Sequence, residues 1–445
     1  MQGMRHWILA GLLIASITTV GEAANYAVAV SKATRAEPGW KEVVETLANK
    51  HQGEIIVYEG RPDEALAKLK ALFPQYTCFV ATPDEAGKEF VERVHRMTRR
   101  LDDDPYTDTS WGIVTGYTPE AALRIAKQSE PLIVRNVAAG TEVALELCET
   151  GRYYNELKPG RVVVKEAGEK PKAEDCPVDT TKALVDALAD ADLFVTSGHA
   201  TEHDWQIGFG YRNGQFRCKD GTLYGLDTKG DKHVIKSAKP KVYLAVGNCL
   251  MGHVDGKDCM ALAWMNSAGV DQMVGYTDLT WFGYGGWGLL DYFVEQPGRF
   301  TLAEAFLANQ HALVNRLESG NAGGDARGLE YDRDIVAFYG DPAWEARMAD
   351  GPKAWDQTLK TEDGVYTLEI TPRLGESTFR PINTNGSQRG GRPIIEFLPG
   401  RVHDVEIVEG ADLKPVITDD FVLIPNPREC KPGQTFRVVF RASGF

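Results

Sequence analysis

The alternation of short, continuously apolar segments with amphipathic ones constrains the fold of this chain more than any other feature. Residues 26–30, 55–58 and 77–81 are apolar runs typical of strands, and 39–50 and 63–73 between them have helical spacing. A strand that is apolar on both faces is buried on both faces. The pattern therefore predicts a parallel sheet with helices packed on its two sides.

The same alternation continues and divides the chain into two α/β subdomains. A helix at 85–101, a strand at 112–115 and a helix from Pro119 toward Ala139 complete the first subdomain, predicted at residues 24–140. The second subdomain is predicted at residues 141–350. Its expected strands lie at 143–148, 162–165, 193–196, 242–246 and 272–275, and its expected helices at 180–188, 260–266 and 303–317.

After about residue 352 the helical spacing disappears. Short alternating segments separated by Gly, Pro and Asn turns replace it, at 365–370, 394–397, 405–408, 421–424 and 436–440. This pattern is typical of a small antiparallel sandwich. The predicted fold class is therefore α/β up to residue 350, followed by an all-β sandwich at residues 352–445.

The first residues have the composition of an export signal. Arg5 and His6 precede an apolar run at 7–20, and small residues follow around Ala23. Because the run is shorter than the ~20 residues that span a bilayer, we expect a signal peptide at residues 1–23 rather than an anchor. No later segment has the apolar length of a membrane span. The mature protein is predicted to be exported, to the periplasm or beyond.

Composition argues against one large class of function. Sixty-three acidic side chains against 49 basic ones give a net charge of −14, whereas a nucleic-acid binder needs a basic surface. The seven cysteines, at positions 78, 148, 176, 218, 249, 259 and 430, are an odd number. At least one of them therefore stays a free thiol, even in an oxidising compartment.

Two apolar strands end in loops that carry a reactive residue. His199 follows the predicted strand at 193–196, and Cys249 follows the one at 242–246. Ligands bind to parallel sheets where the chain leaves the carboxyl ends of the strands. A thiol placed there can attack a carbonyl carbon while an imidazole moves the protons. Cys249 and His199 are therefore the candidate nucleophile and acid/base.

These residues and their surroundings resemble the gingipain family of caspase-like cysteine peptidases. Five blocks follow in that family's order within roughly residues 25–350. They are Trp111-Gly112-Ile113-Val114-Thr115-Gly116, Ser197-Gly198-His199-Ala200-Thr201-Glu202 with Trp205, Asn248-Cys249-Leu250-Met251-Gly252, Gly275-Tyr276-Thr277 with Trp281, and Gly340-Asp341-Pro342-Ala343-Trp344. The resemblance implies a caspase-like catalytic domain in two subdomains with an immunoglobulin-like sandwich behind it. It also implies an exported endopeptidase for protein or peptide substrates that requires no cofactor.

The resemblance also implies roles for individual residues. Cys249 would form a thioester with the acyl group of the substrate, and His199 would protonate the leaving amine and then assist water. Main-chain N–H groups of Cys249 and Ala200 would form the oxyanion hole. The family usually has glycine where this chain has Ala200, so a positive φ there would be costly.

Four further residues receive roles from the same resemblance. Glu149 would be the acidic partner of the histidine, with an ordinary strand-end carboxylate as the alternative. Trp281, Thr277 and Trp205 would bind substrate. The family's best-known members cleave after Arg or Lys, which requires an acidic pocket floor. The corresponding segment matches poorly here, with Glu156 merely nearby.

Other interpretations of the nucleophile stay open. Cys249 could be a structural cysteine, buried or joined to Cys218 or Cys259. The chain could be a degenerate homologue that only binds peptides or surfaces. It could also be a transpeptidase, in which an amine instead of water resolves the thioester.

Two metal sites are alternatives or additions to this chemistry. Zinc could be bound by two pairs of residues spaced i, i+4, namely His199 with His203 and Cys249 with His253. Calcium could be bound as a structural ion by the acidic segment at 102–104 together with Asp108, for which a solvated turn is the alternative.

Overall fold

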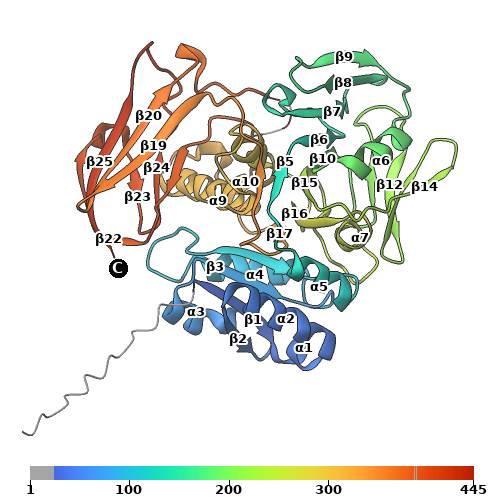
Figure 1. Cartoon of the computed structure of the whole chain (residues 1–445), viewed down its shortest axis with the longest axis horizontal. Coiled ribbons are helices and arrows are strands. Elements are labelled where there is room, and N and C mark those ends of the chain that lie inside the picture. Colours follow the sequence, from blue (N-terminus) through green and yellow to red (C-terminus); the bar gives the residue numbers. More distant parts are fainter. Residues whose placement is uncertain (1–24, 385, 387, 445) are drawn as a thin grey trace, which may run out of the picture.

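The computed structural model describes residues 25–384, 386 and 388–444. The predicted signal peptide, residues 1–23, lies outside these ranges. Figure 1 shows a lower N-terminal unit, a second unit beside it that contains the middle of the chain, and a separate C-terminal unit built from strands alone. No helix in the described ranges has the length and apolar character needed to cross a membrane.

The N-terminal unit is a layered α/β structure. Its four parallel strands lie in the order β2-β1-β3-β4. They are β1 (Tyr26–Ser31), β2 (Glu54–Tyr58), β3 (Tyr76–Val80) and β4 (Ser110–Val114). The helices between and after them are α1 (Lys32–Ala36), α2 (Pro38–His51), α3 (Leu66–Leu72), α4 (Lys88–Thr98) and α5 (Pro119–Lys127). Every residue of β1 and β4 is buried, as expected for strands covered on both faces.

The second unit extends the same sheet, which has 12 strands in the order β2-β1-β3-β4-β17-β16-β15-β10-β6-β7-β8-β9. Its strands are β6 (Asn136–Ala139), β7 (Thr150–Tyr154), β8 (Arg161–Lys165), β9 (Lys172–Asp175), β10 (Leu193–Gly198), β15 (Lys241–Asn248), β16 (Val270–Tyr276) and β17 (Val336–Tyr339). β17 joins the two units, since it pairs parallel with β4 and antiparallel with β16. β6, β7, β10, β15 and β16 run parallel to one another.

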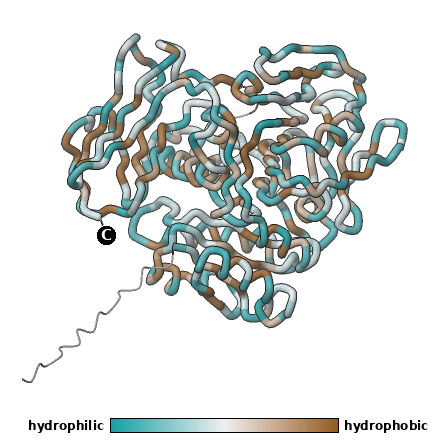
Figure 2. Tube along the Cα trace, in the orientation of Figure 1, coloured by the Kyte–Doolittle hydropathy of each residue, from teal (hydrophilic) through white to brown (hydrophobic). Residues whose placement is uncertain are grey.

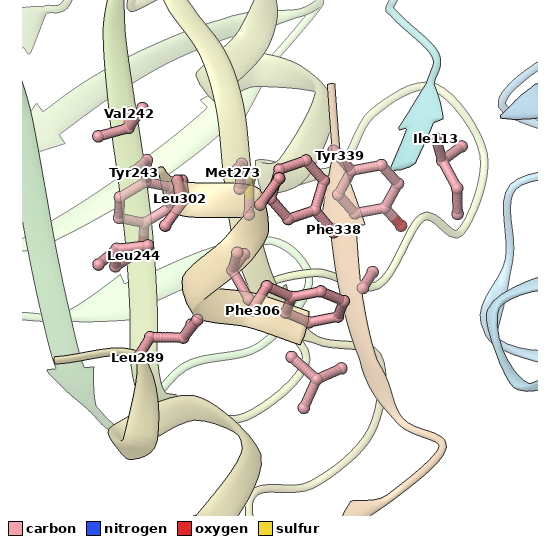
Figure 3. Packing of buried hydrophobic residues seen from close by; sticks show 14 of the residues in the cluster. Ile113, Val242, Tyr243, Leu244, Met273, Leu289, Leu302, Phe306, Phe338 and Tyr339 are labelled. Carbon is pink, nitrogen blue, oxygen red and sulfur yellow. The ribbon is translucent and has the colours of Figure 1, made fainter. Parts of the chain in front are cut away.

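Helices cover the second part of the sheet. They are α6 (Thr181–Asp190), α7 (Met260–Ser267), α8 (Tyr284–Leu289), the π-helical turn η3 (Leu290–Val294), α9 (Leu302–Glu318) and α10 (Ala326–Asp332). Phe306 of α9 packs against Phe338 of β17 with ring centroids 5.4 Å apart, and Leu302 and Met273 lie in the same cluster (Figure 3). Burying each such side chain stabilises the fold by about 1.5–3 kcal/mol. Figure 2 shows the hydrophobic segments running through the interior strands, while the peripheral loops are mostly hydrophilic.

The C-terminal unit consists of two antiparallel sheets. One has the order β19-β20-β25-β22 and the other β21-β24-β23. The strands are β19 (Trp355–Glu362), β20 (Val365–Pro372), β21 (Ile394–Phe397), β22 (Val402–Glu409), β23 (Val416–Ile417), β24 (Phe421–Ile424) and β25 (Phe436–Gly444). They enclose a core of their own, which includes Leu368, Ile370 and Val438. The predicted fold class, α/β followed by an all-β sandwich, is confirmed.

Two predicted elements are wrong. The helix expected from Pro119 toward Ala139 ends at Lys127, and two short strands follow, β5 (Leu132–Val134) and β6. Pro131 cannot continue a helix, and the β-branched residues after it favour a strand. The strand expected at 143–148 is instead a loop containing the 3-10 turn η2 (Leu145–Leu147), and the strand beside β6 is β7.

A small antiparallel sheet in the second unit was not expected from the sequence pattern. It contains β11 (Asp204–Gln206), β12 (Gln215–Lys219), β13 (Thr222–Leu226) and β14 (Lys232–Val234). Trp205 and Phe216 from β11 and β12 pack edge to face, 5.2 Å apart, over Phe194 of β10. This sheet therefore buries one face of the strand that leads to His199.

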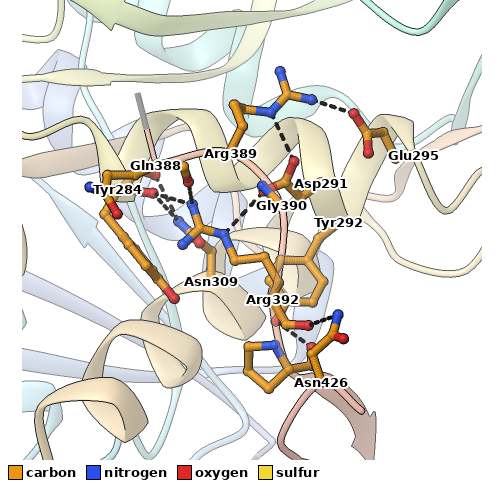
Figure 4. Close-up of polar contacts among 12 residues, drawn as sticks. Tyr284, Asp291, Tyr292, Glu295, Asn309, Gln388, Arg389, Gly390, Arg392 and Asn426 are labelled. Atoms are coloured by element: carbon orange, nitrogen blue, oxygen red, sulfur yellow. Dashed lines mark hydrogen bonds and ion pairs between the residues drawn. The ribbon is translucent and has the colours of Figure 1, made fainter. Parts of the chain in front are cut away.

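A buried ionic network attaches the C-terminal unit to the second unit. Arg389 pairs with Asp291 and Glu295, and Arg392 pairs with the other oxygen of Asp291 at 3.1 Å (Figure 4). The guanidinium of Arg392 also lies over the ring of Tyr284, 3.4 Å from its centroid. All four charged side chains are at most 8% exposed. A buried charge that loses its partner is strongly destabilising.

We therefore expect Arg392→Met to lower the free energy of unfolding by about 3–5 kcal/mol, because it leaves Asp291 buried with fewer donors. Urea unfolding followed by tryptophan fluorescence measures this change. Arg437→Met is the matched control, since Arg437 pairs with Glu409 on the sandwich surface and both side chains are about half exposed. That control should cost about 0–1 kcal/mol. Equal effects of the two substitutions would contradict a stabilising role of the network.

A second prediction concerns His311 of α9, which is fully buried and stacks on Phe421 of β24 with ring centroids 4.1 Å apart. Burial lowers the pKa of His311 from its ordinary 6.5 to about 3. Below pH 6.5 the unfolded chain takes up a proton here while the folded chain does not, so stability is lost as the pH falls from 6.5 toward 3.

The variant His311→Phe should remove this part of the pH dependence and keep the aromatic stack. Below pH 6.5 the difference in free energy of unfolding, variant minus wild type, should increase by about 1.4 kcal/mol for each unit that the pH falls. Above pH 7 the difference between the two should be constant, which provides the internal control. Denaturant unfolding at several pH values tests this, and parallel curves down to pH 4 would contradict it.

Candidate active site

His199 and Cys249 follow the paired ends of two neighbouring strands. β10 and β15 are parallel, and their last paired residues are Gly198 and Asn248. His199 is the residue after β10, and Cys249 is the residue after β15. Both therefore leave the same edge of the sheet, from neighbouring strands about 5 Å apart. His199 is exposed, and Cys249 is half-buried with a free thiol. This placement agrees with the expectation from the sequence.

Buried hydrogen bonds tie the two strand ends together. The side chain of Asn248 is fully buried, and its Nδ2 donates to the carbonyl of Gly198 at 3.1 Å. Its Oδ1 accepts a hydrogen bond from Thr196 Oγ1 at 2.6 Å, and that hydroxyl lies 2.7 Å from Tyr243 OH. Because these contacts cross from β15 to β10, they fix the position of His199 relative to Cys249.

Sharp backbone turns expose the two reactive residues. Gly198, before the histidine, has φ +91°, and Leu250, after the cysteine, has φ +57°. Glycine takes such angles without steric cost. Further on, a Cβ at Gly252 would lie 2.3 Å from the carbonyl oxygen of Gly275. Glycines at 198 and 252 therefore permit the chain to leave the strands and pack closely.

The sulfur of Cys249 accepts a hydrogen bond from the main-chain N–H of Thr280 at 3.2 Å. Thr280 belongs to the loop after β16, which is held against the nucleophile loop by a bond of 3.0 Å from Leu250 N to the Asp278 carbonyl. An N–H directed at sulfur is the kind of contact that a thiolate accepts. Thr280 was not identified from the sequence, since nothing in the residue type marks it.

The imidazole of His199 is supported by an aromatic ring. Phe209 stacks on it with ring centroids 4.7 Å apart and an angle of 24° between the planes. The carbonyl of His199 accepts a hydrogen bond from Gln206 N at 2.9 Å, which fixes the main chain of the loop. The stacking orients the ring while leaving the histidine exposed.

One candidate oxyanion donor is the main-chain N–H of Ala200. Ala200 lies opposite Trp205 in a short antiparallel pairing whose bonds run from Thr201 N to Asp204 O and from Gln206 N to His199 O. In that pattern the N–H of Ala200 points away from its partner strand. The two bonds of this pairing therefore leave the N–H of Ala200 directed away from β11. Ala200 is not among the residues with positive φ, so alanine causes no strain there.

The structure does not bring Glu149 to the histidine. Glu149 precedes β7, so it lies at the amino ends of the parallel strands, opposite the edge that carries His199. It is exposed and pairs with Arg135 at 2.6 Å. The alternative, an ordinary carboxylate at a strand end, describes it correctly.

Glu156 lies at the edge where Glu149 was expected. It follows β7, is 6% exposed, and its carboxylate accepts hydrogen bonds from Thr141 Oγ1 at 2.9 Å and from Ser197 Oγ. A Cβ on Gly198 would lie 4.0 Å from its Oε2. The error in the sequence analysis came from the strand predicted at 143–148, which ends six residues before β7 does and so pointed to residue 149.

Two of the three expected substrate-binding residues are wrong as direct contacts, because both are fully buried. Trp205 has 0% exposure, and its Nε1 donates to the Ser197 carbonyl at 2.8 Å. Thr277 also has 0% exposure, and its hydroxyl donates to the Ile335 carbonyl at 3.0 Å. Both position the edge of the sheet. Trp281, in contrast, is 63% exposed.

The structure supports one of the two possible metal sites and not the other. Asp102, Asp104 and Asp108 place carboxylate oxygens within 4.8 Å of one another, so a structural calcium at this loop stays a prediction. In the described part of the chain this is the one group of potential ligands close enough to share an ion. His199, His203, Cys249 and His253 do not form such a group, so the described structure gives no support to the zinc alternative. All seven cysteines are free thiols, so Cys249 is not in a disulfide.

Comparison with known proteins gives one likeness in structure. No family model matches the chain, and no curated protein sequence matches it. Among solved structures, the chain is similar to the Arg-specific cysteine proteinase gingipain R (RGPB), with 11% sequence identity and a TM-score of 0.46. The likeness covers 92% of each chain and concerns the fold.

The geometry of the candidate oxyanion site predicts the effects of two substitutions at Ala200. Because φ of Ala200 is not positive, Ala200→Gly relieves no strain and leaves the N–H in place. We expect kcat to change by less than about threefold, whereas Ala200→Pro, which removes the N–H, should lower kcat about 100-fold or more. Steady-state kinetics on a peptide substrate measures both. A large gain with glycine would show that the loop is strained.

Proposed function

We propose that this chain is a cysteine endopeptidase that hydrolyses peptide bonds, with Cys249 as nucleophile and His199 as general acid and base. The observation that supports the proposal is the pairing of Gly198 with Asn248, because His199 and Cys249 directly follow these residues at the carboxyl ends of two parallel strands. A thiol and an imidazole at one open edge are the two groups that acyl transfer needs.

Acylation follows from the positions of these groups. His199 takes the proton of the Cys249 thiol, and the resulting thiolate attacks the carbonyl carbon of the scissile bond, whose oxygen becomes an oxyanion. In this proposal the main-chain N–H groups of Cys249 and Ala200 donate to that oxygen. Collapse of this intermediate breaks the C–N bond as His199 gives a proton to the nitrogen, which leaves as an amine and leaves a thioester behind.

Deacylation uses the same residues in reverse. His199 takes a proton from water, and the resulting hydroxide attacks the thioester carbonyl. The oxyanion forms again at the same N–H groups, and its collapse releases a carboxylic acid. The sulfur leaves as a thiolate, for which the N–H of Thr280 is a ready donor.

Glu156 supports the histidine indirectly. Its buried carboxylate binds Ser197, two residues before His199, and so holds the end of β10 in place. We assign it a positioning role in the same mechanism. The sequence at residues 1–23 supports the further proposal that the enzyme acts outside the cytoplasm.

The test is selective modification of the nucleophile. Iodoacetamide should alkylate Cys249 and abolish peptide hydrolysis, and Cys249→Ala should lower kcat at least about a thousandfold without changing the fold. Cys218→Ala is the matched control, because Cys218 is also half-buried. Burial raises the pKa of the Cys218 thiol to about 12, so it should resist alkylation and its loss should leave activity intact.

Three outcomes would contradict this proposal. Full activity in Cys249→Ala would exclude the thioester mechanism. Binding of peptides without turnover would show a degenerate, binding-only protein. Transfer of the acyl group to an added amine in preference to water, detected by mass spectrometry, would show a transpeptidase.

A further inference from the structure

Several large apolar side chains near Cys249 and His199 are exposed to solvent. Leu279 and Trp281 flank Thr280, and they are 56% and 63% exposed. Near the histidine, Phe209 is 46% exposed and Leu157 is 56% exposed. Single exposed apolar residues are common on protein surfaces, but a cluster at one site marks a binding surface. These four residues are called the apolar rim.

The rim is held rigidly beside the nucleophile. The N–H of Thr280 is 3.2 Å from the sulfur of Cys249, so the residues on either side of it are next to the attacking atom. Tyr331 packs edge to face against Trp281 with centroids 6.0 Å apart, and its hydroxyl donates to the Leu279 carbonyl at 3.1 Å. Burial and the nearby Asp278 raise the pKa of Tyr331 to about 12, so the phenol keeps the proton that it donates.

The side near His199 is fixed as well. Phe209 stacks on the imidazole, and its N–H donates to the Glu156 carbonyl at 2.7 Å. That bond joins the loop carrying Phe209 to the segment that continues into Leu157. The rim therefore borders both the atom that attacks the substrate and the group that protonates the leaving amine.

The carboxylates near the rim are already engaged. Glu156 is buried and bonded to Thr141 and Ser197. Asp278 forms an ion pair with Lys88, and Glu202 pairs with His203 at 3.6 Å. An exposed aromatic ring can attract a cation, but a basic side chain that leaves water also needs a carboxylate to replace its hydration.

We propose, on the basis of the peptidase function above, that the site selects an aromatic or large aliphatic side chain in the residue whose carbonyl is attacked, rather than Arg or Lys. That residue is held at the sulfur of Cys249, so its side chain lies within reach of Leu279 and Trp281. Removal of apolar surface from water then supplies the selectivity. This preference would differ from that of an Arg-specific proteinase such as the one that shares the fold.

The experiment compares peptides that differ at one position. Fluorogenic peptides with Phe, Tyr, Leu, Arg or Lys before the scissile bond are cleaved by the wild-type chain, and kcat/KM is measured for each. We expect kcat/KM for Phe, Tyr or Leu to exceed that for Arg or Lys about tenfold or more. The variants Leu279→Ala and Trp281→Ala should each reduce this ratio about tenfold.

The matched control is Leu374→Ala. Leu374 lies on the sandwich and is 55% exposed, almost the same as Leu279, so it tests the general effect of losing an exposed leucine. Its ratio should equal that of the wild type. Alkylation of Cys249 by iodoacetamide is followed in every variant as a readout that does not depend on the substrate.

Each other outcome overturns a different statement. Preferred cleavage after Arg or Lys would overturn the assigned selectivity while the peptidase function stands. An apolar preference that survives in both rim variants would overturn the role of Leu279 and Trp281. No cleavage of any peptide, with Cys249 still alkylated, would overturn the proposed peptidase function itself and the selectivity with it.

Discussion

The parallel pairing of β10 with β15 is the constraint on which the candidate site depends. Two strands that end in register bring the residues after them together without any direct bond between those residues. Asn248 secures this register, because its buried amide donates to Gly198 and accepts from Thr196. A buried amide satisfied on both strands resists sliding, since a slip would leave its polar groups without partners.

The sandwich is connected to the same edge of the sheet through Trp287 of α8. A Cβ on Gly247, two residues before the nucleophile, would lie 2.9 Å from this indole, and a Cβ on Gly386 of the sandwich would lie 2.3 Å from it. The ring thus fills the space between the strand end and the sandwich loop. The buried network around Asp291 anchors that loop (Figure 4). The C-terminal unit therefore packs against the support of the site and is not a remote appendage.

The chemistry proposed at this edge would rely on main-chain groups as much as on side chains. The N–H of Ala200 points away from its partner strand, and that of Thr280 is directed at the sulfur of Cys249. Backbone dipoles held by a sheet need no reorganisation when charge develops, which is why such groups are effective in acyl transfer. The side chains around them supply support, as Phe209 does for the imidazole.

The sequence by itself determined the layered fold and the shared strand edge of His199 and Cys249. Continuously apolar strands can only be buried on both faces, and His199 and Cys249 directly follow two of them, so their shared edge could be predicted. The acidic residue near the histidine and the substrate contacts could not be predicted. They depend on which segments, distant in the sequence, pair at this edge of the sheet. Trp205 is buried because β12 covers it, and Glu156 rather than Glu149 lies at the edge that carries His199 because β7 begins at Thr150. Local propensity does not encode these long-range pairings, and only the tertiary structure decided them.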